Sequence, residues 1–259
     1  MSTTLDQTTR EALFAYILRL GDDSLICGHR LSEWCGHAPF LEEDIALANI
    51  ALDCIGHAAE FLRIAGEVEG KGRDMDKLAY FRTDREYKNL LLLEQPRGDF
   101  AETIAKQFFY DTYSLFLYEA LTKCAFKDLA DMATKALKET KYHFRHSREW
   151  VLRLGDGTPE SHDKIQNAVN YYWRYTPELF YRGQVDQILT TAKVIPELES
   201  IEPEWTKTVS ETLTAATLIL PAPPLKMIYC GREGKHSEHL GHLLAEMQIL
   251  PRTYPNATW

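Results

Sequence analysis

The segment from Asp44 to Arg63, DIALANIALDCIGHAAEFLR, constrains the fold more than any other part of this chain. Between Ile45 and Ala59 the only fully charged residue is Asp53, and neither a proline nor a cluster of turn residues interrupts the run. Pro39 and the acidic residues that follow it are typical of the start of a helix. Because this helix is apolar on nearly every side, we expect it to lie inside a bundle rather than on a surface.

Asp53 limits the environments in which this helix can lie. A membrane span needs about 20 consecutive apolar residues, and Asp53 splits the run, so no membrane span is expected. A buried carboxylate costs several kcal/mol unless another group pairs with it. His57 lies one helical turn further along the same helix and is the nearest candidate partner.

Composition narrows the class of protein. The net charge of −9 and the lack of a dense Lys/Arg cluster argue against a nucleic-acid partner. The first residues, MSTTLDQTTREAL, lack the basic and then apolar layout of a signal peptide. The five cysteines are scattered without CxxC spacing, so we expect free thiols in a reducing cytoplasm.

Helical patterns dominate the chain. Four long helices are predicted, and they cover about Thr9–Trp34, the segment around Asp44 to about Glu67, about Phe100–Cys124 and about Asp128–Leu154. The polar stretch 66–97 is typical of a long connection, and ferritin-type bundles place such a crossover between their second and third helices. We therefore predict an all-α, ferritin-like four-helix bundle.

The rest of the chain is expected to flank that bundle. An aromatic segment covers 160–181, and further helices are predicted at about Trp205–Leu218 and Ser237–Leu250. The aromatic residues are expected to pack in the core or at a subunit interface. No low-complexity linker separates these segments, so residues 1–259 are predicted to form one domain, with its core at about 9–155 and flanking helices at about 158–250.

The midpoints of the four long helices carry the chemically interesting side chains. Antiparallel helices of similar length bring their midpoints to one level, which predicts a single polar layer. Its members are Asp22 or Asp23, Asp53, His57, Asp111, Glu139 and His143.

Two kinds of site could be built from this layer. Carboxylates and imidazoles from four facing helices are the ligands of di-iron and di-manganese centres, which use Glu-x-x-His pairs. Here the spacing from Asp53 to His57 and from Glu139 to His143 is one residue too long. The alternative is a hydrogen-bonded layer that fixes helix register. In that case each pair closes within its own helix, and Arg or Lys from flanking turns neutralises the remaining acids.

Four extended blocks then point to a family. They are RLSEWCGHAPFLEEDIALANIALD (30–53), NLLLLEQPRGDFAETIAKQFFYD (89–111), KALKETKYHFRHSREWVLRLGDGT (135–158) and GKHSEHLGHLLAEMQ (234–248). Together they make the chain resemble the C-subunit family of the bacterial ring 1,2-phenylacetyl-CoA epoxidase over nearly its whole length.

That resemblance implies a ferritin-like subunit in aerobic phenylacetate breakdown that pairs with a related A subunit. The A subunit holds the di-iron centre and binds phenylacetyl-CoA, while a reductase subunit with flavin and iron–sulfur passes on electrons from NADPH. The C subunit itself is implied to be structural, with no catalytic residue and no metal, and an isolated chain could form a homodimer.

The block 231–248 carries one further hypothesis. Arg232, Lys235, His236 and His239 make a local positive or titratable patch in an acidic protein. One interpretation is contact with the partner subunit or with CoA phosphates, which pair readily with such groups. The other is a solvated helix start with Ser237 as its N-cap.

Two other functions stay open from the sequence. The chain could be an independently active di-iron carboxylate oxygenase, or a stand-alone helical module that binds an acyl-CoA. The first requires metal in the purified chain, and the second requires ligand binding without a partner.

Overall fold

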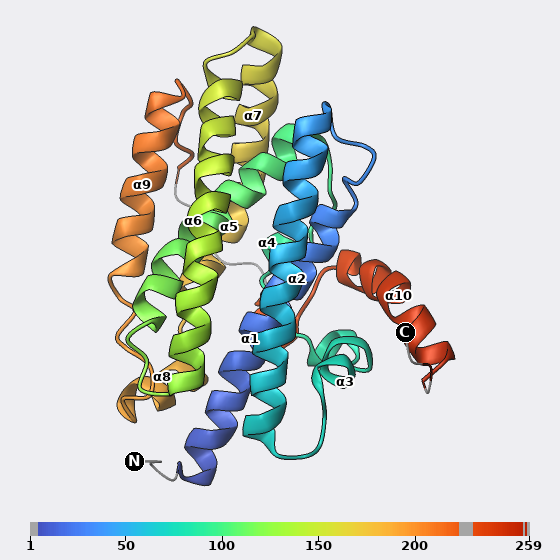
Figure 1. Cartoon of the computed structure of the whole chain (residues 1–259). Helices are drawn as coiled ribbons and strands as arrows, with labels where there is room; N and C mark the ends of the chain where they lie inside the picture. The colour runs from blue at the N-terminus through green and yellow to red at the C-terminus, as the bar shows by residue number, and fades with distance from the viewer. Residues whose placement is uncertain (1–4, 223–229, 256, 258–259) are drawn as a thin grey trace.

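Figure 1 shows a chain built from helices, and the structure, a computed structural model, describes residues 5–222, 230–255 and 257. Four long helices form its centre: α1 (Gln7–Ser32), α2 (Leu41–Glu69), α5 (Phe100–Leu121) and α6 (Lys127–Gly155). Within the described ranges no strand is present. The predicted fold class is confirmed, and the helix bounds differ from the predicted ones by only a few residues.

The four helices are arranged as two hairpins that pack side by side. α1 packs along α2, α5 packs along α6, and α2 and α6 also lie against each other. The long connection between α2 and α5 contains α3 (Met75–Tyr80), a 3-10 turn (Asp84–Glu86) and α4 (Leu91–Glu94). This is the ferritin-like arrangement, with the crossover where the sequence places it.

Two glycines explain how closely α1 and α2 approach each other. A Cβ atom on Gly21 would lie 2.7 Å from a methyl carbon of Leu62, and one on Gly28 would lie 2.8 Å from a methyl carbon of Ile55. Glycine inside a helix costs about 1 kcal/mol relative to alanine. Here that cost allows a tight contact between the two helices.

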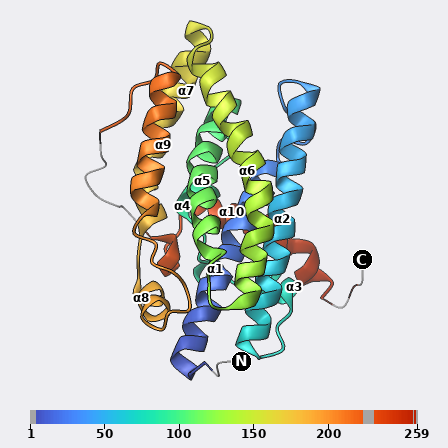
Figure 2. The same ribbon diagram turned by 60° about the vertical axis from the view of Figure 1, so that its left-hand side comes forward.

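Shorter helices surround the bundle. They are α7 (Pro159–Tyr172), a 3-10 segment (Trp173–Phe180), α8 (Gln184–Thr191), α9 (Ile201–Ala215), a 3-10 turn (Gly231–Glu233) and α10 (Glu238–Thr253). α7 and α9 pack on α5 and α6, as Figure 2 shows from the side, while α10 contacts α3 and α4.

The aromatic segment contributes to the core. The ring of Trp173 lies 5.7 Å from those of Phe109 and Trp205, and Phe180 meets Trp205 at 5.3 Å. Trp205 also donates its indole N–H to the carbonyl oxygen of Phe109 at 2.9 Å. These contacts attach the flanking helices to α5, as core packing of the aromatic residues predicts.

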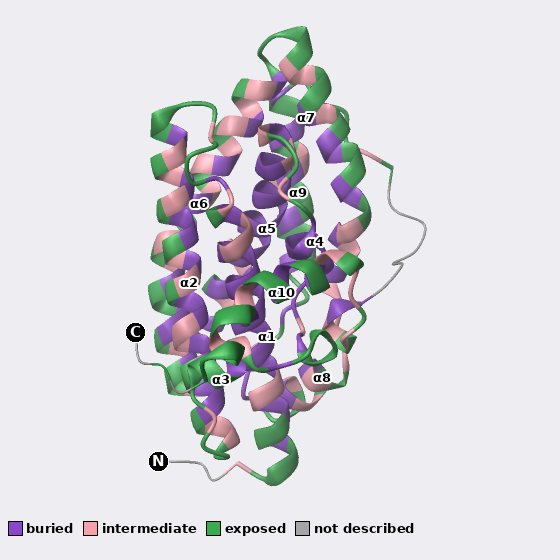
Figure 3. Cartoon of the chain, turned by 90° about the vertical axis from the view of Figure 1, so that its right-hand side faces the viewer, coloured by how far each residue is buried: buried purple, intermediate pink, exposed green. Residues whose placement is uncertain are grey.

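The prediction that α2 lies inside the bundle is wrong for one of its faces. An 18-residue window of α2 has a mean hydropathy of 1.4, yet only 44% of that window is buried. Leu41, Ile45 and Leu52 are 71%, 53% and 68% exposed. Figure 3 shows the outer face of α2 as largely exposed. α2 therefore buries one face in the bundle and leaves a second apolar face uncovered.

Candidate functional site

The polar residues of α2 and α6 pair between the two helices. His143 on α6 hydrogen-bonds Asp53 on α2 with 3.0 Å between Nε2 and Oδ2. His57 on α2 hydrogen-bonds Glu139 on α6. The predicted pairing within each helix is therefore wrong. The i,i+4 spacing stacks each acid and histidine on one face, and where two such faces meet the nearest partner is on the other helix.

These two crossed pairs lie at the edge of the bundle. The imidazoles of His57 and His143 are buried, whereas the carboxylates of Asp53 and Glu139 are 36% and 35% exposed. The two rings are 6.4 Å apart. Burial lowers the pKa of His57 below its usual value, and the hydrogen bond with Glu139 offsets only part of that effect. The pairs therefore link α2 to α6 and leave two carboxylates facing outward.

Asp111 lies deeper, on α5. It accepts a hydrogen bond from the Ser147 hydroxyl at 2.8 Å and a longer one from the Gln107 amide at 3.4 Å. Among the described residues no arginine or lysine hydrogen-bonds to it, and burial raises the pKa of Asp111 to about 6. The carboxyl group is thus held by neutral partners in the centre of the bundle.

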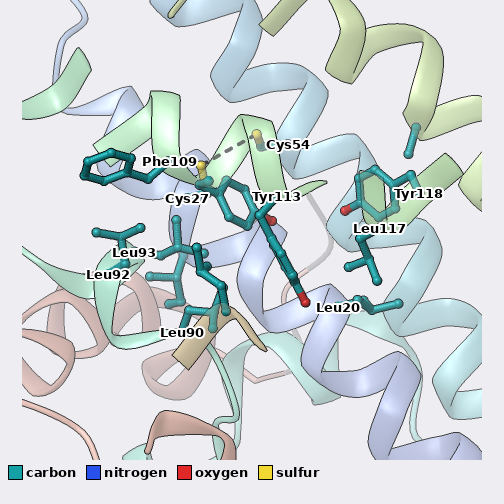
Figure 4. Close-up of a cluster of buried hydrophobic side chains, with 14 of the residues drawn as sticks. Leu20, Cys27, Cys54, Leu90, Leu92, Leu93, Phe109, Tyr113, Leu117 and Tyr118 are labelled. Carbon is teal, nitrogen blue, oxygen red and sulfur yellow. Dashed lines mark hydrogen bonds between the residues drawn. The ribbon is translucent and has the colours of Figure 1, made fainter. Parts of the chain in front are cut away.

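Next to Asp111, α1 contributes a thiol instead of a carboxylate. Cys27 donates to the Gln107 side-chain oxygen at 3.4 Å, and its sulfur lies 3.9 Å from that of Cys54 on α2. Figure 4 shows the two sulfurs facing each other among buried leucines and tyrosines. Both thiols are free, as the cysteine spacing predicts. Cys27 therefore takes the place in the layer that Asp22 or Asp23 was expected to fill.

Asp22 is neutralised by the crossover. Its carboxylate is fully buried and forms a two-pronged ion pair with Arg82, one arm of which measures 3.0 Å. The backbone N–H of Lys88 donates to the same carboxylate at 2.8 Å. Arg82 also donates to two backbone carbonyls, so each charged group is satisfied.

Asp23 is neutralised by the C-terminal part of the chain. Arg232 contacts its two carboxylate oxygens at 3.0 and 2.7 Å, and the Leu90 N–H donates at 2.8 Å. Burial works against the charged form of Arg232, but Asp23 and the other acidic groups around it together outweigh burial and raise the pKa of the guanidinium. The prediction that basic residues of flanking turns neutralise the remaining acids is confirmed for both Asp22 and Asp23.

The donor set does not fit a dimetal centre. Asp22 and Asp23 are each held by an arginine, and the acids on α2 and α6 bind imidazoles at the edge of the bundle. Across the described ranges, no group of three or more His, Cys, Asp or Glu residues is placed to hold a metal ion. A dimetal site needs several carboxylates converging on one point, and these point to separate partners.

The proposed phosphate-contact residues are split between core and surface. Like that of Arg232, the side chain of His236 is buried, with 2.7 Å from Nδ1 to Glu94 and 2.9 Å from Nε2 to the Tyr87 carbonyl oxygen. Lys235 is exposed and pairs with Glu233. His239 is half-buried on α10. Only Lys235 and His239 are thus placed to meet a ligand at the surface.

Ser237 holds the N-cap position of α10, but its hydroxyl makes no capping hydrogen bond to that helix. Its backbone N–H instead donates to Glu94 at 2.6 Å. The start of α10 is therefore attached to the crossover through Glu94, which also accepts from His236.

Sequence reasoning missed two acids that hold the outer segments together. Glu94, in LLLLEQP, is completely buried, and Glu178, in TPELFY, is almost completely buried. Glu178 accepts the backbone N–H of Leu91 and of Gly231, and burial raises the pKa of Glu178 to about 7. A single acid inside an apolar run was the available signal, the same one that singled out Asp53.

Comparison with known proteins agrees with this structure. A family model described as "Phenylacetic acid catabolic protein" matches residues 1–259. The chain is also 45% identical over 247 residues to the C subunit of 1,2-phenylacetyl-CoA epoxidase from Escherichia coli (strain K12), covering 95% of this chain and 99% of that protein. By both measures the chain belongs to the phenylacetic acid catabolic protein family.

Proposed function

We propose that this chain is a structural, non-catalytic subunit of a 1,2-phenylacetyl-CoA epoxidase. It pairs with the catalytic A subunit and stabilises it, in the cytoplasm. Its support is the similarity to an epoxidase C subunit along nearly the whole chain, together with the ferritin-like bundle.

One observation carries the non-catalytic part of this proposal. Each acid of the polar layer already has an internal partner: Arg82, Arg232, Ser147, and two histidines of α2 and α6. An independent di-iron oxygenase would need such carboxylates free to converge on metal. Here they fix the positions of the helices, the crossover and the C-terminal segment relative to one another.

In the proposed complex, the A subunit holds the di-iron centre and binds phenylacetyl-CoA. Electrons reach it from NADPH through a reductase subunit with flavin and iron–sulfur groups. This chain supplies no ligand to any of these cofactors. Its contribution is a rigid surface on which the A subunit is held in its active form.

The test is co-expression with the A subunit, followed by size-exclusion chromatography, iron analysis and turnover of phenylacetyl-CoA with the reductase present. We expect a heteromeric complex whose iron amounts to about two per A subunit, with none bound to this chain. The complex with Asp53→Ala should keep its activity. A correctly assembled but inactive Asp53→Ala complex would refute the non-catalytic role.

The competing functions are tested on the isolated chain. About two irons per chain after growth with added iron, together with an oxo-bridged spectrum, would show an independent oxygenase. Micromolar binding of phenylacetyl-CoA by calorimetry, without any partner, would show an acyl-CoA-binding module. We expect neither result.

A further inference from the structure

The uncovered face of α2 is a continuous apolar row. Leu41, Ile45 and Leu52 are exposed along it, and their spacing by fours and sevens places them on one side of the helix. We call this row the α2 stripe, and its members are Leu41, Ile45, Ala48, Leu52, Gly56 and Ala59. It extends about 27 Å along the helix axis at about 1.5 Å per residue.

This row is more than the scattered apolar exposure of an ordinary surface. Single exposed leucines are common in soluble proteins, but contiguous apolar patches mark binding surfaces. Phe40, just before α2, is 53% exposed, and Tyr142, on the neighbouring α6, is 43% exposed. Exposed aromatic residues, which are enriched in protein interfaces, therefore lie just before α2 and on the adjacent helix.

Gly56 leaves room for a partner on the same face of α2. It lies on an exposed part of α2, and a Cβ atom built on it would meet nothing within 4 Å. Contacts within the described chain therefore do not explain a glycine in the middle of a helix, in contrast to Gly21 and Gly28 on α1. Close approach of another chain's backbone would explain it, because only glycine leaves room for such an approach.

The charges around the stripe indicate what kind of partner fits. Helical spacing places Glu42, Asp53 and Glu60 along one edge of the stripe and Asp44 on the other, and Arg63, at the C-terminal end of the stripe, pairs with Glu60 at 3.0 Å. Asp53 and Glu139 each use one carboxylate oxygen for a histidine; within the described chain the other oxygen has no hydrogen-bond partner. The border is therefore acidic and able to accept hydrogen bonds from arginine or lysine.

We infer that the α2 stripe is the surface on which this chain docks to the epoxidase A subunit, which would present an apolar helix face flanked by arginine or lysine. This inference rests on the proposed function. A second copy of this chain fits less well, because two-fold symmetry would bring the acidic border against itself. A membrane surface fits less well too, because a row of carboxylates lines one edge of the stripe and Asp44 lies on the other.

The first test is Leu52→Glu in this chain, with binding to the purified A subunit measured by titration. Placing a charge at the centre of the interface should weaken binding by about thirtyfold or more. The matched control is Ile219→Glu, which changes an isoleucine that is 75% exposed after α9 and should leave binding unchanged. Both variants should melt within a few degrees of wild type, because both side chains are exposed in the isolated chain.

The second test uses the two open glycines. Gly56→Leu should block close approach of the A subunit and weaken binding at least tenfold. Gly241→Leu is the control, because Gly241 is also exposed within a helix, α10, and a Cβ there also meets nothing within 4 Å. It should bind as wild type does.

The outcomes separate this inference from the proposed function. If the wild-type chain and the A subunit do not associate, the proposed function fails. If they associate and Leu52→Glu binds as tightly as Ile219→Glu, the docking surface is refuted and the proposed function stands. Two other results for Leu52→Glu would overturn the inference, both with A-subunit binding unchanged. One is that the variant breaks up a homodimer of the isolated chain. The other is that the variant loses binding to anionic vesicles.

A variant that fails to fold does not leave the inference untested. Hydrogen exchange on the wild-type chain, with and without the A subunit, gives the same information. Added protection of exposed α6 residues and of the α2 stripe supports the docking surface, and protection confined to α9 or α10 refutes it.

Discussion

Replacing Arg232 by methionine separates the structural interpretation of the C-terminal segment from the ligand-binding one. The Arg232 side chain is 6% exposed and contacts both oxygens of Asp23, and it donates to the Lys88 carbonyl oxygen at 2.8 Å. Without it, the buried Asp23 carboxylate keeps the Leu90 N–H as its one hydrogen-bond donor among the described residues. Leaving one buried charge of a pair unpaired costs about 3–5 kcal/mol.

For a domain of this size, each kcal/mol corresponds to about 2–4 °C in melting temperature, so Arg232→Met should melt about 6–20 °C below wild type. The assay is thermal unfolding followed by circular dichroism, with urea unfolding as a check on the free energy. The matched control is Lys235→Met, because the Lys235 side chain is 66% exposed and pairs with Glu233 at the surface. Its free energy of unfolding should change by no more than about 0.5 kcal/mol.

A double variant isolates the contribution of the pair. Asp23→Leu combined with Arg232→Met should cost about 0.5–3 kcal/mol less than the sum of the two single changes, because the pair is lost only once. The reasoning is refuted if Arg232→Met and Lys235→Met unfold alike. It is also refuted if Arg232→Met keeps full stability while binding of an acyl-CoA by the complex falls.

Three further predictions concern residues in α2, α5 and α10. Burial raises the pKa of Asp111 from 3.8 to about 6. Between these pH values the folded chain keeps a proton that the unfolded chain has released, so stability falls as pH rises through this window. The stability of Asp111→Asn relative to wild type should therefore be higher at pH 8 than at pH 4 by roughly 2.5 kcal/mol, because each pKa unit contributes about 1.4 kcal/mol and part of the effect is already present at pH 4. Equal differences in urea unfolding at both pH values would contradict this. Asp53→Ala should lower stability by about 1 kcal/mol, because a buried histidine loses its partner at a site that water partly screens, and thermal unfolding showing no loss would refute the interhelical pair. Gly56→Ala and Gly241→Ala should each raise the free energy of unfolding of the isolated chain by about 0.5–1 kcal/mol, and destabilisation at Gly56 would reveal a contact within the chain.

Much of the fold could be predicted from the sequence because helix signals are local. The apolar period, the acidic first turn before Ile45 and the polar crossover each act within a few residues, and they place α1, α2, α5 and α6 within a few residues of their bounds. The free, mostly buried cysteines and the aromatic packing around Trp205 follow from the same kind of local pattern.

The partners of the buried acids could not be predicted in the same way. Asp22 meets Arg82 from 60 residues away, and Asp23 meets Arg232 from 209 residues away. No period in the sequence connects such positions, since the path of the crossover and the C-terminal segment decides which turn reaches which helix. The crossed pairing of Asp53 with His143 depends likewise on how α2 and α6 face each other.

α2 shows a second limit of prediction from the sequence. Its sequence is apolar nearly all round, which predicts complete burial, and a single chain of this length covers only one of its faces. The sequence signal reports every surface that a helix buries, whether against its own chain or against another. We interpret the second apolar face of α2 as a partner-binding surface. Only the structure of the single chain could distinguish it from the face that packs in the core.

The most direct test of the central claim is made on Asp111, the acid of the predicted layer whose hydrogen-bond partners among the described residues are neutral. The complex of this chain carrying Asp111→Asn with the A subunit is purified, and its iron content and rate of phenylacetyl-CoA turnover are measured beside those of the wild-type complex. If the acids of this chain only support the fold, both values equal those of the wild-type complex within about twofold, a rate difference of less than about 0.5 kcal/mol. A fully assembled Asp111→Asn complex that has lost iron, or whose turnover has fallen at least tenfold, would contradict the account.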